Sequence, residues 1–267
     1  MFYRVNMATL TITQEDGGAY KGLGGRALTS RIVMSEVDPQ VHALGPNNKL
    51  VIAPGLLSGT GAPNAGRMSL GAKSPLTGTI KESNTGGAMS HKLGRLGIEA
   101  IIIEGAPQSG SSYVLKIDKQ GLSLQDMPEL KGLDIYDTAA KLLEKFGAKA
   151  AVGCIGTAGE NKMASACIGF TDMEGAPTRQ AGRGGMGAVM ASKGLKAIVA
   201  DDAGCGMIPL ADEPAFRAGS KKLAGALLKH PVTSQGLPTY GTDVLTNILS
   251  EAGGLPTRNF STGRFEG

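Results

Sequence analysis

Three polar, glycine-rich clusters hold the residues of this chain that are best suited to bind a ligand. They cover residues 59–67, 83–87 and 179–187. Glycine allows an oxygen atom to approach the backbone closely, and arginine offers a planar fork of donors that matches a phosphate group. The arginines of the first and third clusters are Arg67, Arg179 and Arg183. Together the three clusters indicate a site for one or more phosphates.

The second and third clusters also lie at the starts of predicted helices. The sequence predicts one helix over residues 84–96, entered through Gly86 and Gly87, and another over residues 182–193. The free amides at the amino terminus of a helix bind anions. A single glycine cluster is more often a tight turn than a ligand site, but three clusters combined with arginine favour a ligand.

Other catalytic motifs do not occur in the chain. No GK[ST] follows the glycines at 184–185, the segment 22–25 does not match GxGxxG, and the GxSxG and HExxH patterns are absent. We interpret His91, on a predicted helix, as a surface or packing residue. Glu160 is interpreted as a structural cap or turn residue. No catalytic residue is therefore predicted within the chain.

The composition argues against several functional classes. A net charge of +4 with 4% aromatic residues and no Trp lacks the basic stripe and stacking aromatics of a nucleic-acid-binding protein. Cys154, Cys167 and Cys205 are too scattered for a disulfide framework or a self-contained zinc or iron–sulfur site, and we interpret them as free thiols. Apolar stretches are too short to span a bilayer, and the amino terminus does not resemble a signal peptide. We expect a cytoplasmic protein that binds neither nucleic acid nor membrane.

Strands predominate up to about Met207, and amphipathic helices follow Pro209. Strands are predicted over residues 2–6, 9–13, 50–53, 65–72, 98–104, 113–117, 122–124, 150–155, 164–170 and 197–200. Further helices are predicted from the segment 22–26 to Asp38, and over 135–146, 212–228 and 242–252. The chain is thus predicted to form a β-rich domain over residues 1–208 and the incomplete start of a helical domain over residues 209–267.

The order of these motifs resembles the aldehyde ferredoxin oxidoreductase family. The similarity covers nearly the whole chain and is specific for the family rather than for one member. The segments that carry it are 47–50, 59–63, 66–67, 73–78, 83–87, 101–105, 155–161, 181–193, 236–242 and 258–260.

This resemblance implies an α+β fold. Two β-sheets with a few helices would form a base that supports the cofactor, followed by the beginning of an all-helical domain. The family binds tungsten, or sometimes molybdenum, through the dithiolenes of two pterins, and a magnesium ion bridges the two pterin phosphates. A [4Fe–4S] cluster passes electrons to ferredoxin. The implied reaction oxidises an aldehyde with water to a carboxylic acid.

The resemblance also assigns roles to residues of the clusters. Arg67 matches the arginine between pterin and iron–sulfur cluster, and Asn84 and Ala181 match positions whose backbone carbonyls bind magnesium. The glycine–arginine loops match segments that contact pterin and phosphate. The cofactor-binding residues predicted from the clusters and the resemblance together are Arg67, Asn84, Thr85, Gly86, Gly87, Arg179, Ala181, Gly182, Arg183, Gly184 and Gly185.

Other parts of the family pattern lie outside this chain. The cysteine motif that holds the iron–sulfur cluster would follow the segment present here, and the three cysteines match none of its positions. We therefore expect the chain to need the remaining domains or a partner subunit for catalysis. A cradle that is built to be covered also favours a homo-oligomer or a poorly soluble chain.

Two alternatives stay open at this point. One is a non-catalytic pterin- or phosphate-binding subunit of a split complex. The other is a relative with different low-potential redox chemistry, such as reduction of an aromatic acyl-CoA. The sequence does not choose between tungsten and molybdenum, or among aldehydes.

Overall fold

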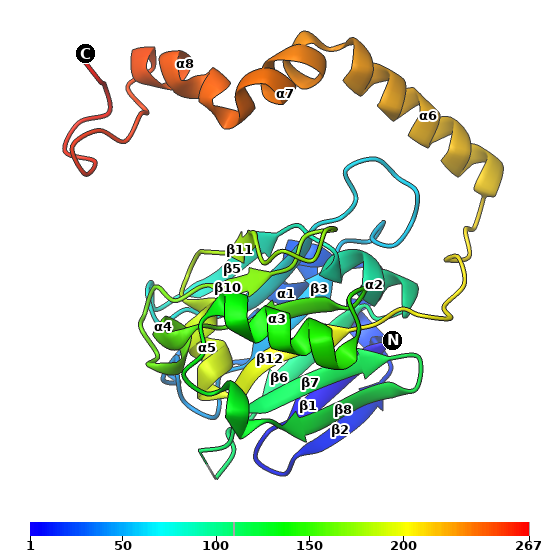
Figure 1. Ribbon diagram of the computed structural model, residues 1–267, viewed down its shortest axis with the longest axis vertical. Coiled ribbons are helices and arrows are strands. Elements are labelled where there is room, and N and C mark those ends of the chain that lie inside the picture. The colour runs from blue at the N-terminus through cyan, green and yellow to red at the C-terminus, as the bar shows by residue number, and fades with distance from the viewer. Residues whose placement is uncertain (109, 267) are drawn as a thin grey trace. The chain divides into compact units, whose positions relative to one another are not determined.

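The computed structural model describes residues 1–108 and 110–266 and contains two compact units, Met1–Pro209 and Leu210–Gly267. The first unit carries two six-stranded β-sheets, and the second consists mostly of helices (Figure 1). This architecture confirms the predicted α+β class with two sheets.

The first sheet has the strand order β2-β1-β6-β3-β4-β5. Its strands are β1 (Phe2–Asn6), β2 (Thr11–Glu15), β3 (Leu50–Pro54), β4 (Met68–Lys73), β5 (Ile80–Thr85) and β6 (Ala100–Glu104). β1 and β6 run parallel, and the other neighbours are antiparallel. The isoleucine-rich β6 is buried and lies between β1 and β3, as expected for a central strand with many β-branched residues.

The second sheet has the strand order β11-β10-β9-β12-β7-β8. Its strands are β7 (Tyr113–Asp118), β8 (Gly121–Asp126), β9 (Ala151–Cys154), β10 (Ile168–Phe170), β11 (Arg179–Ala181) and β12 (Leu195–Ala200). β7 and β8 form the predicted hairpin, with Asp118 opposite Gly121. Gly121 has a φ of +122°, which favours glycine at this turn.

The main hydrophobic core contains side chains from both sheets together with α2 (Met89–Arg95) and α5 (Met186–Ser192). α1 (Gly25–Glu36) packs on the other face of the first sheet, and α3 (Ile135–Phe146) packs on the other face of the second. Successive side chains of a strand point to opposite faces. In β3, Ile52 therefore joins the main core while Val51 joins the cluster under α1.

The remaining short elements of the first unit are two 3-10 turns and one short helix. They are η1 (Gly18–Tyr20), η2 (Pro128–Leu130) and α4 (Thr157–Glu160). The second unit consists of α6 (Glu213–Lys229), the π-helical turn η3 (Val232–Gly236), α7 (Leu237–Tyr240), the 3-10 turn η4 (Gly241–Leu245) and α8 (Thr246–Glu251). Across residues 1–108 and 110–266, no helix is long and apolar enough to cross a membrane.

The segment around the second glycine cluster differs from its prediction. Asn84 and Thr85 end the strand β5, and the helix α2 begins only at Met89. The prediction of a helix from residue 84 was wrong because β5 is polar and shows no apolar alternation. Pairing with β4, in which Ser69 lies opposite Asn84, decides its conformation.

The third cluster shows a similar difference. The short strand β11 was not predicted, and the helix α5 starts at Met186 rather than at residue 182. Three residues are too few for a strand to produce a pattern in the sequence. Pairing of β11 with β10 defines it, with Ala181 opposite Ile168.

Candidate functional site

The two sheets approach each other at their edge strands β5 and β11, which are in contact. The amide of Arg183 donates to the hydroxyl of Ser83 at 2.9 Å. Just beyond, the hydroxyl of Ser74 donates to the carbonyl oxygen of Gly184 at 2.7 Å. The first of these hydrogen bonds joins the second and third glycine clusters across 100 residues of sequence, and the second joins the third cluster to the turn before β5.

Arg67, which directly precedes β4, brings the first cluster into contact with the second. Nε of Arg67 donates to Oδ1 of Asn84 at 2.6 Å, and Nδ2 of Asn84 donates to the hydroxyl of Ser69 at 3.2 Å. A Cβ built on Gly86 would lie 3.7 Å from Nη1 of Arg67 and would meet nothing closer. The guanidinium group of Arg67 therefore lies beside exposed backbone of the second cluster.

Gly87 packs closely against the backbone at Thr171 and lies beside Arg179 of the third cluster. Its φ is +96°, and a Cβ built there would lie 2.4 Å from the carbonyl oxygen of Thr171 and 3.4 Å from Cγ of Arg179. The next amide, that of Ala88, donates to the same Thr171 carbonyl at 3.1 Å. Only glycine fits both this backbone conformation and this contact.

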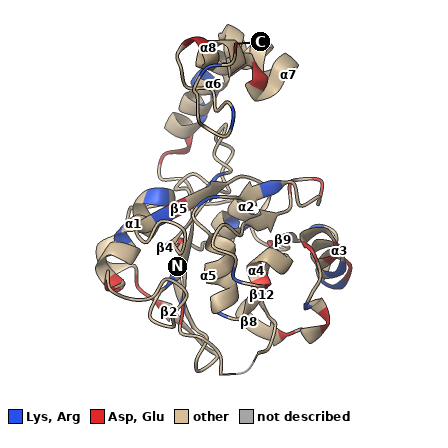
Figure 2. Cartoon of the chain, turned by 90° about the vertical axis from the view of Figure 1, so that its left-hand side faces the viewer, with Lys and Arg blue, Asp and Glu red and all other residues tan. Residues whose placement is uncertain are grey.

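The three arginines of the clusters are all exposed. Within the described residues, neither Arg67 nor Arg183 forms an ion pair with a carboxylate. Arg179 lies near Asp172, whose pKa is lowered first by the hydrogen bond from Thr178 and also by the charge of Arg179. Lys and Arg residues also lie along α1 and around α2 (Figure 2). The cluster arginines place positive charge at the edge where the sheets meet, and this charge suits an anion.

The glycines of the third cluster fall into two kinds. Gly182 is exposed, and a Cβ there would meet nothing within 4 Å. Gly184 and Gly185 are buried, both with φ of +71°, and a Cβ on Gly185 would lie 2.0 Å from the carbonyl oxygen of Ala164. Gly182 thus leaves open backbone at the site. Gly184 and Gly185 serve close packing here, and their contact with a ligand stays a prediction.

The two positions predicted to bind magnesium both lie on edge strands. Asn84 belongs to β5, whose sheet partner is β4, and Ala181 belongs to β11, whose sheet partner is β10. An edge strand has one side on which its carbonyl groups are not used by the sheet. Magnesium prefers such hard oxygen ligands and completes its shell with phosphate and water. The positions therefore fit the predicted group, although the ligation itself stays a prediction.

Two residues near this site carried no signal in the sequence. Oε1 of Glu82, in β5, forms an ion pair with Nη2 of Arg26, in α1, at 2.9 Å. The other carboxylate oxygen of Glu82, Oε2, is buried and has no hydrogen-bond partner in the described part of the chain. His91 of α2 accepts a hydrogen bond from the amide of Gly59. Neither residue belongs to a motif, because its role depends on which elements pack together.

Comparison of the amino-acid sequence with models of known protein families identifies the family of this chain. The model of the aldehyde ferredoxin oxidoreductase N-terminal domain matches residues 2–202. The chain belongs to the aldehyde ferredoxin oxidoreductase family. This confirms the resemblance inferred from the glycine–arginine motifs.

Curated proteins that are similar to this chain carry the name of the same family. The chain is 41% identical over 269 residues to the tungsten-containing aldehyde ferredoxin oxidoreductase of Thermococcus kodakarensis, covering 99% of this chain and 43% of the relative. It is 40% identical over 266 residues to the enzyme of that name from Pyrococcus furiosus, covering 98% of this chain and 42% of the relative. The chain thus spans less than half the length of these family members.

More distant relatives differ in their chemistry. A WOR-like subunit of the aliphatic sulfonate oxidoreductase of Pyrococcus furiosus is 31% identical over 200 residues, covering 69% of this chain and 31% of the relative. Among solved structures, the active-site complex BamBC of benzoyl coenzyme A reductase with 1,5-dienoyl-CoA matches with a TM-score of 0.77 and 29% identity. That match covers 85% of this chain and 34% of the other. The fold of the aldehyde ferredoxin oxidoreductase family is therefore also present in this complex.

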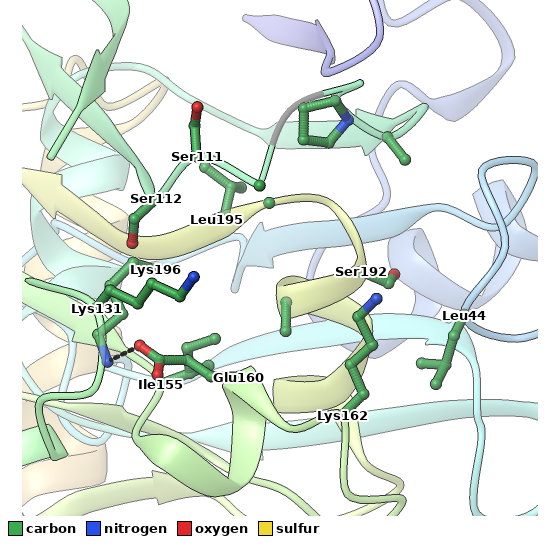
Figure 3. Close-up of a pocket in the computed structure, with 15 residues that line it drawn as sticks. Leu44, Ser111, Ser112, Lys131, Ile155, Glu160, Lys162, Ser192, Leu195 and Lys196 are labelled. Atoms are coloured by element: carbon green, nitrogen blue, oxygen red, sulfur yellow. Dashed lines mark hydrogen bonds and ion pairs between the residues drawn. The ribbon is translucent and has the colours of Figure 1, made fainter. Parts of the chain in front are cut away.

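A separate pocket of about 360 Å³ lies near the start of β12 (Figure 3). It is lined in part by Lys131, Lys162, Glu160 and Lys196, and by none of the residues predicted to bind the cofactor. Nζ of Lys196 donates to Oε1 of Glu160 at 2.6 Å and to the carbonyl oxygen of Leu133 at 2.7 Å. Glu160 also accepts from the amide of Gly132 at 2.9 Å. Glu160 is therefore engaged in structural contacts, in agreement with its interpretation as a structural residue.

The three cysteines are expected to differ in reactivity. Burial raises the pKa of the Cys154 thiol to about 12, whereas Cys167 and Cys205 are partly exposed. We expect iodoacetamide to label Cys167 and Cys205 in the folded chain, and to label Cys154 at least about 100-fold more slowly. Peptide mass spectrometry measures the three rates. In urea the rate at Cys154 should rise to that of the others, and a Cys154→Ser variant should show unchanged labelling of the other two. Equal rates in the folded chain would contradict the burial of this thiol.

Proposed function

We propose that this chain is the cofactor-holding base of an oxidoreductase of its family. The complete protein would oxidise an aldehyde with water to a carboxylic acid and pass the electrons to ferredoxin. The observation that supports this proposal best is the meeting of three glycine-rich clusters, two of which contain arginine, at the edge strands β5 and β11. Residues far apart in the sequence form one exposed, electropositive surface with open backbone at Gly86 and Gly182.

In this proposal the arginines bind the anionic parts of a bis-pterin cofactor. Arg179 and Arg183 bind phosphate through fork-shaped, charge-assisted hydrogen bonds. Arg67 is oriented by its Nε hydrogen bond to Asn84, and its Nη groups would face the cofactor and the route of the electrons. The open backbone at Gly86 and Gly182 allows the rings or phosphates to come close. The backbone carbonyl groups of Asn84 and Ala181 would hold a magnesium ion beside the cofactor.

The two-electron redox chemistry is supplied by tungsten, or molybdenum, when the bis-pterin is bound, and the protein contributes binding, orientation and charge. Tungsten is favoured by the names of the most similar curated relatives. No residue of this chain is proposed as an acid, base or nucleophile. Those groups, and the ligands of the [4Fe–4S] cluster, are proposed to lie on the rest of the protein or on a partner subunit.

Because the chain spans about 42% of its Pyrococcus furiosus relative, we propose that it works only together with those further parts. Its exposed clusters are then covered by them, or in their absence by a second copy of the chain. The cytoplasm, where ferredoxin is reduced, is the proposed location.

A second candidate is a subunit with other low-potential chemistry. The similarity to a subunit of a sulfonate oxidoreductase and to a benzoyl coenzyme A reductase complex supports it. In that case the base would hold the same kind of cofactor while the partner decides the substrate. A non-catalytic pterin-binding subunit is the limiting form of this alternative.

Co-expression tests the proposal directly. The chain is produced together with the proposed remaining domains or partner subunit that carry the cysteine motif, and the purified complex is analysed for tungsten, molybdenum, pterin and iron. We expect tungsten and pterin to co-purify with the chain and aldehydes to reduce ferredoxin. A complex that contains neither metal nor pterin would refute the cofactor-holding role. A loaded complex that acts on acyl-CoA and not on aldehydes would favour the second candidate.

A further inference from the structure

Helix α2 is fastened to the first glycine cluster by several polar contacts. The hydroxyl of Ser90 donates to the carbonyl oxygen of Arg67 at 2.9 Å and lies 2.7 Å from the hydroxyl of Ser58. The amide of Gly59 donates to Nδ1 of His91 at 3.1 Å. These contacts hold the segment between β3 and β4, which ends at Arg67, against the helix that follows the second cluster.

The imidazole ring of His91 touches both ends of this segment. A Cβ built on Gly66 would lie 2.5 Å from Nε2 of His91. A Cβ built on Gly59 would lie 2.9 Å from the amide nitrogen of Arg95 and 3.0 Å from the carbonyl oxygen of His91. Glycine at both positions therefore lets α2 approach, and the ring fixes residues 59–66 from one side.

The hydrogen bond requires a neutral ring. Nδ1 accepts only when its proton is absent, so the remaining proton belongs on Nε2. Burial, and then the positive charge of Arg95, lower the pKa of His91 and favour this neutral form. The other charged groups around the ring are Lys92 and Asp202, which form an ion pair that Arg95 joins at 2.9 Å, and Arg67 at the end of the segment.

We propose that His91 is a positioning residue for Arg67. It does not contact the cofactor. Its Nδ1 anchors the amide of Gly59 and its ring supports Gly66, so that the following residue, Arg67, is held where its Nε reaches Asn84. The importance of this geometry for cofactor binding rests on the proposed function, whereas the anchoring of the segment does not depend on it.

Amide hydrogen exchange of the 267-residue chain tests the anchoring without any cofactor. His91→Ala is expected to raise exchange over residues 57–67 about 10-fold, the order expected for loss of one partly buried hydrogen bond, and to leave the β7–β8 hairpin unchanged. His91→Asn should restore protection, because its Oδ1 can accept in place of Nδ1. His230→Ala is the matched control, since Nδ1 of His230 accepts from the amide of Val232 at 3.3 Å in the second unit. It should leave residues 57–67 unaffected.

Acid provides a second readout that loss of packing alone does not reproduce. A histidine whose pKa is lowered in the folded state stabilises the fold above its ordinary value of about 6.5 and loses this effect as pH falls through the lowered value. After correction for intrinsic exchange, protection of residues 57–67 should therefore weaken in the wild type as the pH falls below about 6.5. It should not weaken in His91→Asn, which has no titrating group there.

The outcomes separate this inference from the proposed function. Unchanged exchange over residues 57–67 in His91→Ala, or an equal pH response in His91→Asn, overturns the positioning role. If His91→Ala does not fold, Gly66→Ala, whose Cβ displaces the ring, must loosen the same segment. Cofactor content of the co-expressed complex is measured for the same variants and should fall in His91→Ala and return in His91→Asn. A loosened segment in a complex whose wild type contains no cofactor leaves the anchoring intact and refutes only the proposed function.

Discussion

Replacement of Arg67 by Ala is expected to weaken retention of the pterin cofactor by roughly 10- to 100-fold, the range that corresponds to one or two charge-assisted hydrogen bonds. Arg67 is exposed, forms no ion pair within the described residues, and is oriented by its 2.6 Å hydrogen bond to Asn84. Its removal therefore takes away a donor fork and a positive charge without opening the core. Metal and pterin content after dialysis of the co-expressed complex measures the effect.

Two further variants make this result specific. Arg67→Lys keeps the charge but loses the planar fork, so its retention should lie between those of the wild type and Arg67→Ala. Arg31→Ala removes another exposed arginine, one that belongs to α1 and to none of the clusters, and should retain cofactor normally. Full retention in Arg67→Ala, or an equal loss in Arg31→Ala, would contradict the assigned role.

Replacement of Glu160 by Ala is expected to destabilise the first unit by about 3 kcal/mol, because it leaves a buried ammonium group without its partner. The side chain of Lys196 is only 1% exposed and pairs with Glu160 at 2.6 Å. Glu160 also accepts a hydrogen bond from the amide of Gly132, and this amide would lose its partner in the variant. Urea unfolding of the chain, followed by circular dichroism, measures the change in the free energy of unfolding.

The pair between the amino-terminal ammonium of Met1 and Glu99 provides the matched control. It has a similar separation of 2.8 Å, but its side chains are 42% and 49% exposed. Water screens such a pair, so Glu99→Ala should change stability by less than about 1 kcal/mol. Adding Lys196→Met to Glu160→Ala should recover part of the loss, since the unpaired charge is then gone. A loss of similar size in Glu99→Ala and Glu160→Ala would show that burial of Lys196 is not the cause.

Some elements could be predicted because their signals are local. The helix α3 occupies the predicted residues 135–146, since its apolar face repeats with helical period and Asp134 caps it by accepting the amide of Asp137 at 2.9 Å. The run of isoleucines in β6 likewise lies in a buried central strand. These features depend on neighbouring residues, so no knowledge of the rest of the fold is needed.

Elements that depend on distant partners were not predictable. β5 is polar after Ile80, and only its pairing with β4 makes it a strand. In the same way, Gly182 and Gly185 look alike in the sequence. The structure separates them, because Gly185 is packed against the carbonyl oxygen of Ala164 while Gly182 is open. Burial of a glycine depends on which segment covers it, and that segment is remote in the sequence.

From the sequence, the order of the motifs was enough to recognise the family, and residue type and spacing within the clusters were enough to predict close backbone approach and fork-shaped donors for an anion. The sequence also contained all the predicted contact residues. Tertiary structure alone decided that the clusters share one surface. The bond from the Arg183 amide to the Ser83 hydroxyl joins residues 100 positions apart, and such a contact arises only when two sheets are brought edge to edge by a common core. For the same reason the contact of His91 with the first cluster became visible only after α2 was in place.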